Sequence, residues 1–280
     1  MTEHQNSRRL DGQVIVMSGG SRGIGLSILC AAAARGANAV ILAKTDQPDH
    51  RLPGTVHTAV QQVREAGGEA VAVVGDVRRD EDVQRAAATA IETFGQIDIV
   101  VNNASAISKA DTSEISMKQF DLMQDINVRG TFALTQACLP ALTASPHGRI
   151  LTLSPPLNLA DHWMGRHPAY TMTKYAMTLL TLGWAAELKD RGIDAYCLWP
   201  QTRIATAVIQ NLLGGEEALA RSRDPQIMAD AAVQLFTALP GELSGRTLID
   251  AEVLAATGEI DLSKYGGGDD PVLDLYVDPA

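Results

Sequence analysis

The chain has 280 residues, a hydrophobic content of 46% and a formal net charge of −10. This length fits one large α/β domain or two small ones, and the apolar content is ample for a core. The acidic balance argues against a nucleic-acid partner, whose phosphates require a basic surface, and is typical of an ordinary soluble protein.

Apolar runs of strand length alternate with longer stretches that have helical periodicity. Several runs are apolar throughout, as strands buried on both faces of a parallel sheet must be. The strand candidates are Val14–Ser18, Ala39–Ala43, Ala70–Val74, Ile97–Val101, Arg149–Leu153, Asp194–Trp199 and Thr247–Asp250. The helix candidates are Ile24–Arg35, Val56–Ala66, Glu81–Phe94, Phe120–Thr143, Ala169–Asp190 and Gln226–Leu239.

This alternation predicts a single-domain α/β fold, a doubly wound parallel sheet of about seven strands (the Rossmann fold) with helices on both faces. We expect a flexible N-terminal tail over residues 1–10 and the Rossmann domain over residues 11–257. The C-terminal tail, residues 258–280, contains three consecutive glycines and is predicted to be irregular, packed on the domain or on an interface.

Neither the N-terminus nor the cysteines indicate an exported or membrane protein. Residues 1–10 are polar and contain no apolar core of a signal peptide, and no apolar run reaches the roughly 20 residues of a membrane span. Cys30, Cys138 and Cys197 lie far apart in apolar runs, with neither disulfide nor metal-ligand spacing. We therefore expect a cytoplasmic protein with reduced cysteines, no metal and no membrane span.

A glycine-rich turn joins the first strand candidate to the first helix candidate. Gly19 permits a tight turn, Gly23 lets the backbone approach a pyrophosphate, and Gly25 lets the helix pack closely on the strand. The spacing is G-x-x-x-G-x-G and not G-x-G-x-x-G, so a plain tight turn is the alternative. The residues predicted to bind dinucleotide phosphates are Gly19, Ser21, Arg22, Gly23, Ile24 and Gly25.

The second and third strand candidates end in residues that indicate which dinucleotide binds. The second ends at Lys44 without a carboxylate for the ribose 2′-hydroxyl of NAD. Lys44 and Arg22 could meet a 2′-phosphate, which predicts NADP(H) in preference to NAD(H) unless both are solvated surface charges. After the third strand, Asp76 could accept from the adenine amino group and Val77 could cover the ring, or Asp76 could cap the next helix.

Tyr170 and Lys174 lie four residues apart on one helix candidate and therefore share a face. A free tyrosine, with a pKa of about 10, is a poor acid or base at neutral pH. A nearby ammonium group favours the phenolate and lowers that pKa. Tyr170 could then donate a proton to a carbonyl oxygen as a hydride arrives, or remove it in the reverse direction.

These motifs, in this order, resemble those of the short-chain dehydrogenase/reductase family. Asn102-Asn103-Ala104 and Asn127-Val128-Arg129-Gly130 complete the pattern, and the resemblance covers Leu10 to Asp250. It is closest to the hydroxysteroid dehydrogenase-like branch in the stretches Ala43–Pro48, Asn103–Ser108 and Ser154–Leu159.

The resemblance implies a role for each matching residue. Tyr170 is the acid/base, Lys174 binds the nicotinamide ribose and lowers the tyrosine pKa, and Asn127 holds a relay water. Asn103, Ala104 and Ser105 lie along the cofactor. From local sequence alone, Asn102 and Asn103 could equally form a strand-end turn, and Asn127 could be a mid-helix residue that bonds locally.

The sequence departs from the family pattern at two places. A gap-free alignment puts Pro155 where the family has its substrate-polarising serine, and Ser154 stands one position early. The motif context favours a catalytic role for Ser154, whereas strand geometry opposes it, because adjacent strand residues point to opposite faces. After the sixth strand, Pro200, Thr202 and Ile204 are expected to meet the nicotinamide, although Thr202 and Thr206 could instead cap the next helix.

The segments beside Tyr170 indicate the substrate. His162, Trp163, Met164 and His167 precede it, and Thr206 to Leu213 could form an apolar lid, which predicts a pocket for a lipid-like, steroid-like or other carbonyl compound. The resulting hypothesis is an NADP(H)-dependent oxidoreductase on a hydroxyl/carbonyl pair. The alternative is a catalytically weak or inactive NADP(H)- or lipid-binding member of the same fold.

The resemblance also implies a homo-oligomer, a tetramer or a dimer. The two long helix candidates, Phe120–Thr143 and Ala169–Asp190, are expected to form the subunit interface.

Overall fold

The computed structural model describes residues 9–49, 54–207 and 215–279. These residues contain one sheet with the strand order β3-β2-β1-β4-β5-β6-β7, and every pair of neighbours is parallel. The predicted Rossmann-type sheet is therefore confirmed. Its strands are β1 (Val14–Ser18), β2 (Asn38–Ala43), β3 (Ala70–Val74), β4 (Ile99–Asn102), β5 (Arg149–Thr152), β6 (Asp194–Trp199) and β7 (Thr247–Ile249).

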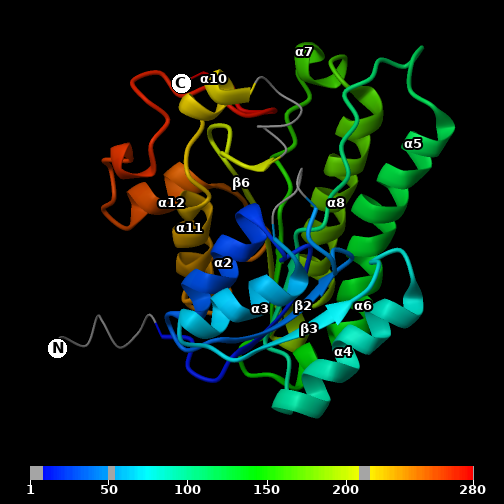
Figure 1. The fold of residues 1–280 in the computed structure, drawn as a ribbon, viewed down its shortest axis with the longest axis vertical. Helices are drawn as coiled ribbons and strands as arrows, with labels where there is room; N and C mark the ends of the chain where they lie inside the picture. Colours follow the sequence, from blue (N-terminus) through cyan, green and yellow to red (C-terminus); the bar gives the residue numbers. More distant parts are fainter. Residues whose placement is uncertain (1–8, 50–53, 208–214, 280) are drawn as a thin grey trace.

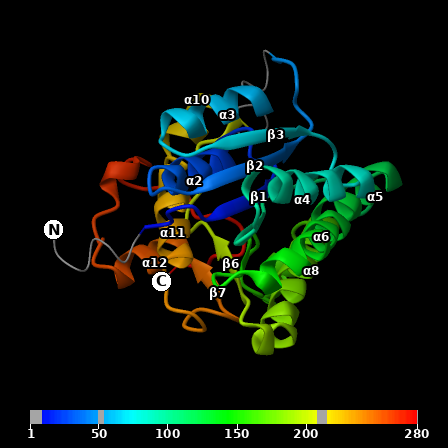
Figure 2. The ribbon, with the colours of Figure 1, turned by 90° about the horizontal axis from the view of Figure 1, so that it is seen from below.

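Helices cover both faces of the sheet, as Figures 1 and 2 show. One layer holds α2 (Gly23–Ala33), α3 (Val56–Glu65), α11 (Gln226–Phe236) and α12 (Asp250–Ala256). The other holds α4 (Asp80–Phe94), α6 (Gly130–Ala144) and α8 (Pro168–Glu187). Two separate apolar clusters fill the spaces between the sheet and these layers, and both are mainly aliphatic. Strands buried on both faces explain why their sequences lack a polar alternation.

The helix predicted over Phe120–Thr143 is not one regular helix. Ser116 caps α5 (Met117–Met123) in a reciprocal capping box with Gln119, which places the start three residues early. A π-helical segment, η1 (Gln124–Arg129), then joins α5 to α6. Such π-turns are rare and are often found at functional sites. Local periodicity could not reveal the extra residue per turn.

Three short helices lie where the sequence predicted loops or made no prediction. They are α7 (Asp161–Met164), α10 (Gly215–Ala220) and α12. Short 3-10 segments, η2 (Lys189–Arg191) and η3 (Ser263–Tyr265), follow α8 and α12. Each is too short to leave a clear helical period in the sequence.

The N-terminal end of the domain differs from the prediction, whereas the C-terminal segment packs on the domain as expected. Leu10 is fully buried and its backbone N–H donates to the carbonyl of Arg35 at 2.8 Å, so the folded part includes residues assigned to the tail; residues 1–8 lie outside those described. The C-terminal segment packs on the domain. Leu273 pairs with Thr202 in an antiparallel bridge, and the buried Tyr276 contacts the hydroxyl of Thr171 at 3.0 Å.

The described ranges contain no helix long and apolar enough to cross a membrane. Within the same ranges, no three His, Cys, Asp or Glu side chains are grouped as metal ligands would be. Cys30, Cys138 and Cys197 are free thiols.

Candidate active site

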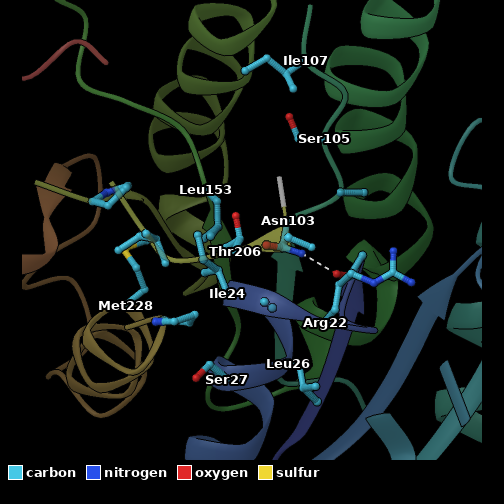
Figure 3. A pocket seen from close by; sticks show the side chains of 18 of the residues that line it. Arg22, Ile24, Leu26, Ser27, Asn103, Ser105, Ile107, Leu153, Thr206 and Met228 are labelled. Atoms are coloured by element: carbon cyan, nitrogen blue, oxygen red, sulfur yellow. Dashed lines mark hydrogen bonds between the residues drawn. The ribbon is translucent and has the colours of Figure 1, made fainter. Parts of the chain in front are cut away.

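A cavity of about 990 Å³ opens at the carboxyl ends of the central strands. Its walls come from the turns after β1, β2, β3, β4, β5 and β6, together with α2, α8 and the C-terminal segment. In Figure 3, Ile24, Leu26 and Ser27 of α2 lie toward one end of the cavity, and Ser105 and Ile107 lie toward the other. This is the crevice in which open α/β sheets bind their ligands.

The glycine-rich turn adopts the geometry that its glycines allow. Gly19 and Gly23 have φ values of +73° and +54°, which favour glycine. A Cβ on Gly25 would lie 2.6 Å from Nδ2 of Asn103. That amide donates to the carbonyls of Gly19 and Ser18 at 2.8 and 3.1 Å, so the turn and the end of β4 are locked together. Every residue predicted for the phosphate end lines the cavity.

The adenosine end of the cavity carries two cations. Arg22 donates to the carbonyl of Gly54 at 2.7 Å. Burial lowers the pKa of Arg22, and the charge of Asp49 partly raises it. Lys44 has a side chain that is 57% exposed, and its Nζ lies 4.0 Å from the Asp76 carboxylate. Asp76 pairs more closely with Arg78, at 2.6 Å. Asp76 does not cap α4, whose first helical residue follows Arg79.

Tyr170 and Lys174 are both buried on α8 and both line the cavity. The ammonium of Lys174 donates to the carbonyl of Leu153 at 2.6 Å and lies 5.0 Å from the centre of the Trp199 ring. Burial lowers the pKa of Lys174 to about 7, although the nearby Cys197 and Asp274 oppose this.

The Tyr170 phenol does not have the depressed pKa that the sequence analysis expected. Burial raises its pKa well above 10, and the charges of Tyr276 and Asp274 act in the same direction. Hydrogen bonding with the Ser105 side chain partly lowers the pKa. Desolvation therefore dominates the pKa of Tyr170, and the ammonium of Lys174 donates to a backbone carbonyl.

Asn127 lies beside the cavity wall and not in it. It sits in the π-helical segment η1 and is fully buried. Its amide accepts from the backbone N–H of Ala106 at 2.7 Å and donates to the carbonyl of Ala106 at 3.0 Å and to Thr173 at 2.9 Å. These bonds join distant segments, so the local-bonding alternative is wrong. They fix the segment after β4 against α8.

Two further predicted site residues, besides Asn127, do not line the cavity. β5 ends at Thr152, and it is Leu153 that lines the cavity while Ser154 is fully buried beside the Cys197 thiol. The backbone turns directly after β5, since the N–H of Ser154 donates to the carbonyl of Thr152 at 3.0 Å, and Ser154 lies outside the cavity wall. Thr202 is also buried outside the wall, because its segment pairs with Leu273; Pro200, Ile204 and Thr206 do line the cavity.

The remaining predicted pocket residues divide into two groups. Trp163 lines the cavity and donates from Nε1 to Asp278 at 2.9 Å. His162 contacts the same carboxylate but lies outside the wall, and Met164 is exposed. His167 precedes α8 outside the wall. Most of the expected lid, residues 208–213, lies outside the described residues.

Sequence reasoning missed part of the cavity wall. Lys109, Arg166 and Arg203 line it, as do Leu273, Asp274 and Leu275 from the C-terminal segment. The nearly continuous apolar run from Val272 to Val277, interrupted only by Asp274, was a signal that this segment could adopt an extended, buried conformation. No local pattern singled out the three cations.

Comparison with known proteins agrees with this geometry. A model of the short chain dehydrogenase family matches residues 13–214. Hydroxysteroid dehydrogenase-like protein 2 of Danio rerio is 44% identical over 261 residues, which cover 93% of this chain and 62% of that protein. The chain thus spans about three fifths of the length of this curated relative.

Two solved structures cover nearly the whole chain. A putative dehydrogenase from Xanthomonas campestris has a TM-score of 0.91 and 45% identity, covering 97% of this chain and all of its own. A short chain dehydrogenase from Mycobacterium thermoresistibile has a TM-score of 0.91 and 48% identity, covering 96% of each chain. The chain belongs to the short-chain dehydrogenase/reductase family.

Proposed function

We propose that this short-chain dehydrogenase/reductase transfers a hydride between NADP(H) and a hydroxyl/carbonyl pair, with Tyr170 as the acid/base. The observation that carries the proposal is the position of the Tyr170 phenol on the wall of the cavity, one helical turn from the buried Lys174. The glycine-rich turn lines the opposite part of the same cavity, so one bound dinucleotide can extend from the turn to the phenol.

The described residues fit a nicotinamide dinucleotide. The N-terminus of α2 presents backbone N–H groups and a partial positive charge to a pyrophosphate, and Gly23 leaves the backbone there without a side chain. Pro200 and Ile204 supply an apolar surface for the nicotinamide near Lys174. When bound, the nicotinamide supplies or accepts the hydride.

The protein residues then handle the proton and hold the substrate oxygen. The phenol of Tyr170 would donate its proton to the carbonyl oxygen in reduction and accept it back in oxidation. Lys174, protonated at pH values below its pKa of about 7, places a positive charge on the same cavity wall, one helical turn from Tyr170. Asn127 holds the segment that carries Ser105 at the distance from α8 that this arrangement requires.

Ser105 is our proposed replacement for the family serine. Ser105 lines the cavity, and hydrogen bonding with its side chain lowers the pKa of Tyr170, whereas Ser154 is buried beside Cys197. Two hydroxyl groups would then converge on one substrate oxygen, although they come from the segment after β4 and from α8. This arrangement favours a working enzyme over the catalytically inactive binding protein.

The charges at the adenosine end support a preference for NADP(H). Arg22 and Lys44 both line the cavity, and no carboxylate ends β2, where NAD-binding proteins often have one. The apolar residues at the other end, among them Ile107, Trp163 and Leu275, support a hydrophobic carbonyl substrate.

Exposed apolar side chains support the proposed oligomer. Phe132 on α6 is 44% exposed, and Met172 and Leu179 on α8 are 46% and 58% exposed. Helices that present such residues on the outer layer are suited to pack against a second copy.

We expect Tyr170→Phe to lower kcat by about 10²–10⁴-fold because it removes the only proposed proton donor. The affinity for NADPH should change little, because the ring and its packing remain. Stopped-flow turnover and a fluorescence titration of NADPH measure the two effects separately. Turnover at the parent rate would rule out the acid/base role.

Ser105→Ala should lower kcat by about 10²-fold, in the range found when one donor to a reacting oxygen is removed. Ser154→Ala is the matched control and should keep a kcat close to that of the parent. Thermal unfolding of both variants checks that the fold survives. If Ser154→Ala lowers kcat and Ser105→Ala does not, then Ser154 and not Ser105 takes the role of the family serine.

Lys44→Ala should weaken NADPH binding by about tenfold and leave NADH binding unchanged, because one charge-assisted contact to the 2′-phosphate is lost. Lys189→Ala, an exposed lysine at the other edge of the sheet, is the control. Titration by nucleotide fluorescence gives both affinities. Equal affinities of the parent protein for NADPH and NADH would contradict the proposed preference.

Light scattering should give the mass of a dimer or tetramer at micromolar concentration. Met172→Glu and Leu179→Glu together should shift the distribution toward monomer, since two charges would be buried in the proposed interface. A parent protein that is monomeric under these conditions is incompatible with the interface.

A further inference from the structure

Three basic side chains meet at the substrate end of the cavity. Lys109 follows β4, Arg166 lies between α7 and α8, and Arg203 follows β6, and all three line the cavity wall. They come from separate segments of a chain whose net charge is −10. We call this group the cationic cluster.

The members of the cationic cluster lie close enough to affect one another. Burial lowers the pKa of Lys109, the charges of Arg203 and Arg166 lower it further, and Asp274 opposes them. The pKa of His167, three residues before Tyr170, is lowered by burial and then by the charges of Lys109 and Arg166, against Asp111 and the backbone of Lys109. Lys109 and Arg166 therefore lie near His167, the residue before the start of α8.

In the part of the chain that the structure describes, the three cations form no close ion pair with the protein. Asp274 is the acidic side chain that lines this end of the cavity, and its pKa is raised by burial despite hydrogen bonding from Leu275 and the charges of Lys109, Arg203 and Lys174. Within the described residues, none of the three cations has a carboxylate within the 4.0 Å of an ion pair. By contrast, Arg78 and Arg129 on the surface pair with acids at 2.6 and 2.8 Å.

Like charges that are partly desolvated in one wall repel one another and destabilise the unliganded protein. A bound anion relieves this repulsion. We propose that the cationic cluster binds an anionic group on the substrate, a carboxylate or a phosphate, while Ile107, Trp163 and Leu275 hold its apolar part. This inference rests on the proposed oxidoreductase function and narrows its substrate to anionic carbonyl or hydroxyl compounds.

The cofactor phosphates are a less suitable partner for the cluster. The pyrophosphate is expected at the glycine-rich turn, and the 2′-phosphate at Arg22 and Lys44, which belong to the other end of the wall. Figure 3 shows Ile107, two residues before Lys109, at the end of the pocket remote from Leu26 and Ser27 of α2. A substrate beyond the nicotinamide can reach the cluster without displacing the dinucleotide.

Binding to the NADP⁺-loaded protein tests this without requiring turnover. Isothermal titration compares octanoate with octanamide and octyl phosphate with 1-octanol, so that each pair differs mainly in its charge. We expect at least one anion to bind about tenfold or more tightly than its neutral partner, as a charge-assisted contact predicts. Which anion shows the preference distinguishes a carboxylate from a phosphate group.

The variant Lys109→Ala/Arg203→Ala should reduce that preference to less than about threefold, since two charge-assisted contacts are removed. Lys189→Ala/Arg246→Ala is the matched control, because it also removes one lysine and one arginine, at the opposite edge of the sheet. If the alanine variant does not fold, Lys109→Met/Arg203→Met retains more side-chain volume and replaces it. NADP⁺ affinity of each variant is measured in parallel.

Two results would overturn the inference. The first is that the parent protein binds each anion and its neutral partner with equal affinity. A cluster variant that loses NADP⁺ affinity but keeps the anion preference is the other, since the cations would then serve the cofactor. Because Tyr170→Phe leaves the cluster intact, full turnover by that variant would refute the oxidoreductase mechanism while leaving anion binding in place.

Discussion

The whole site depends on one constraint, the parallel pairing of the central strands. Parallel strands place all their carboxyl ends at one edge, and β1 and β4 end side by side at Ser18 and Asn102. The Ser18 hydroxyl accepts from the backbone N–H groups of Asn103 and Ala104 at 3.3 and 3.1 Å. These two bonds join the glycine-rich turn to the segment that carries Ser105. The two ends of the cavity are therefore held in a fixed relation to each other.

The parts of the fold that could be predicted are those whose cause is local. Strands such as Val14–Ser18 are apolar because both faces are buried, and Gly19 and Gly23 are glycines because their φ values are positive. Ser154 was less predictable, since one residue decides which face it takes. β5 ends at Thr152 and not at the expected Leu153. The backbone turns there, because the N–H of Ser154 donates to the carbonyl of Thr152, and Leu153 lines the cavity.

The parts that could not be predicted depend on contacts between residues far apart in the chain. Asn127 bonds to Ala106 and Thr173, and this requires the π-turn that the sequence does not signal. The C-terminal segment is placed by Tyr276 against Thr171 and by Asp278 against Trp163, more than a hundred residues away. A glycine-rich stretch before it predicts irregular backbone, yet that backbone completes the substrate end of the wall.

An acidic protein can contain a basic cavity, because charges on the surface are screened by salt and charges in the cavity wall act on their close neighbours. Surface charges are screened over about 8 Å in physiological salt, so the excess of acidic residues has little influence inside the cavity. Within the wall, burial weakens that screening and strengthens each local interaction. The desolvation that lowers the pKa of Lys174 to about 7 acts on Lys109 in the same direction. An anion that enters this end therefore stabilises the charged form of Lys109, and substrate binding and the protonation of the cavity wall are coupled.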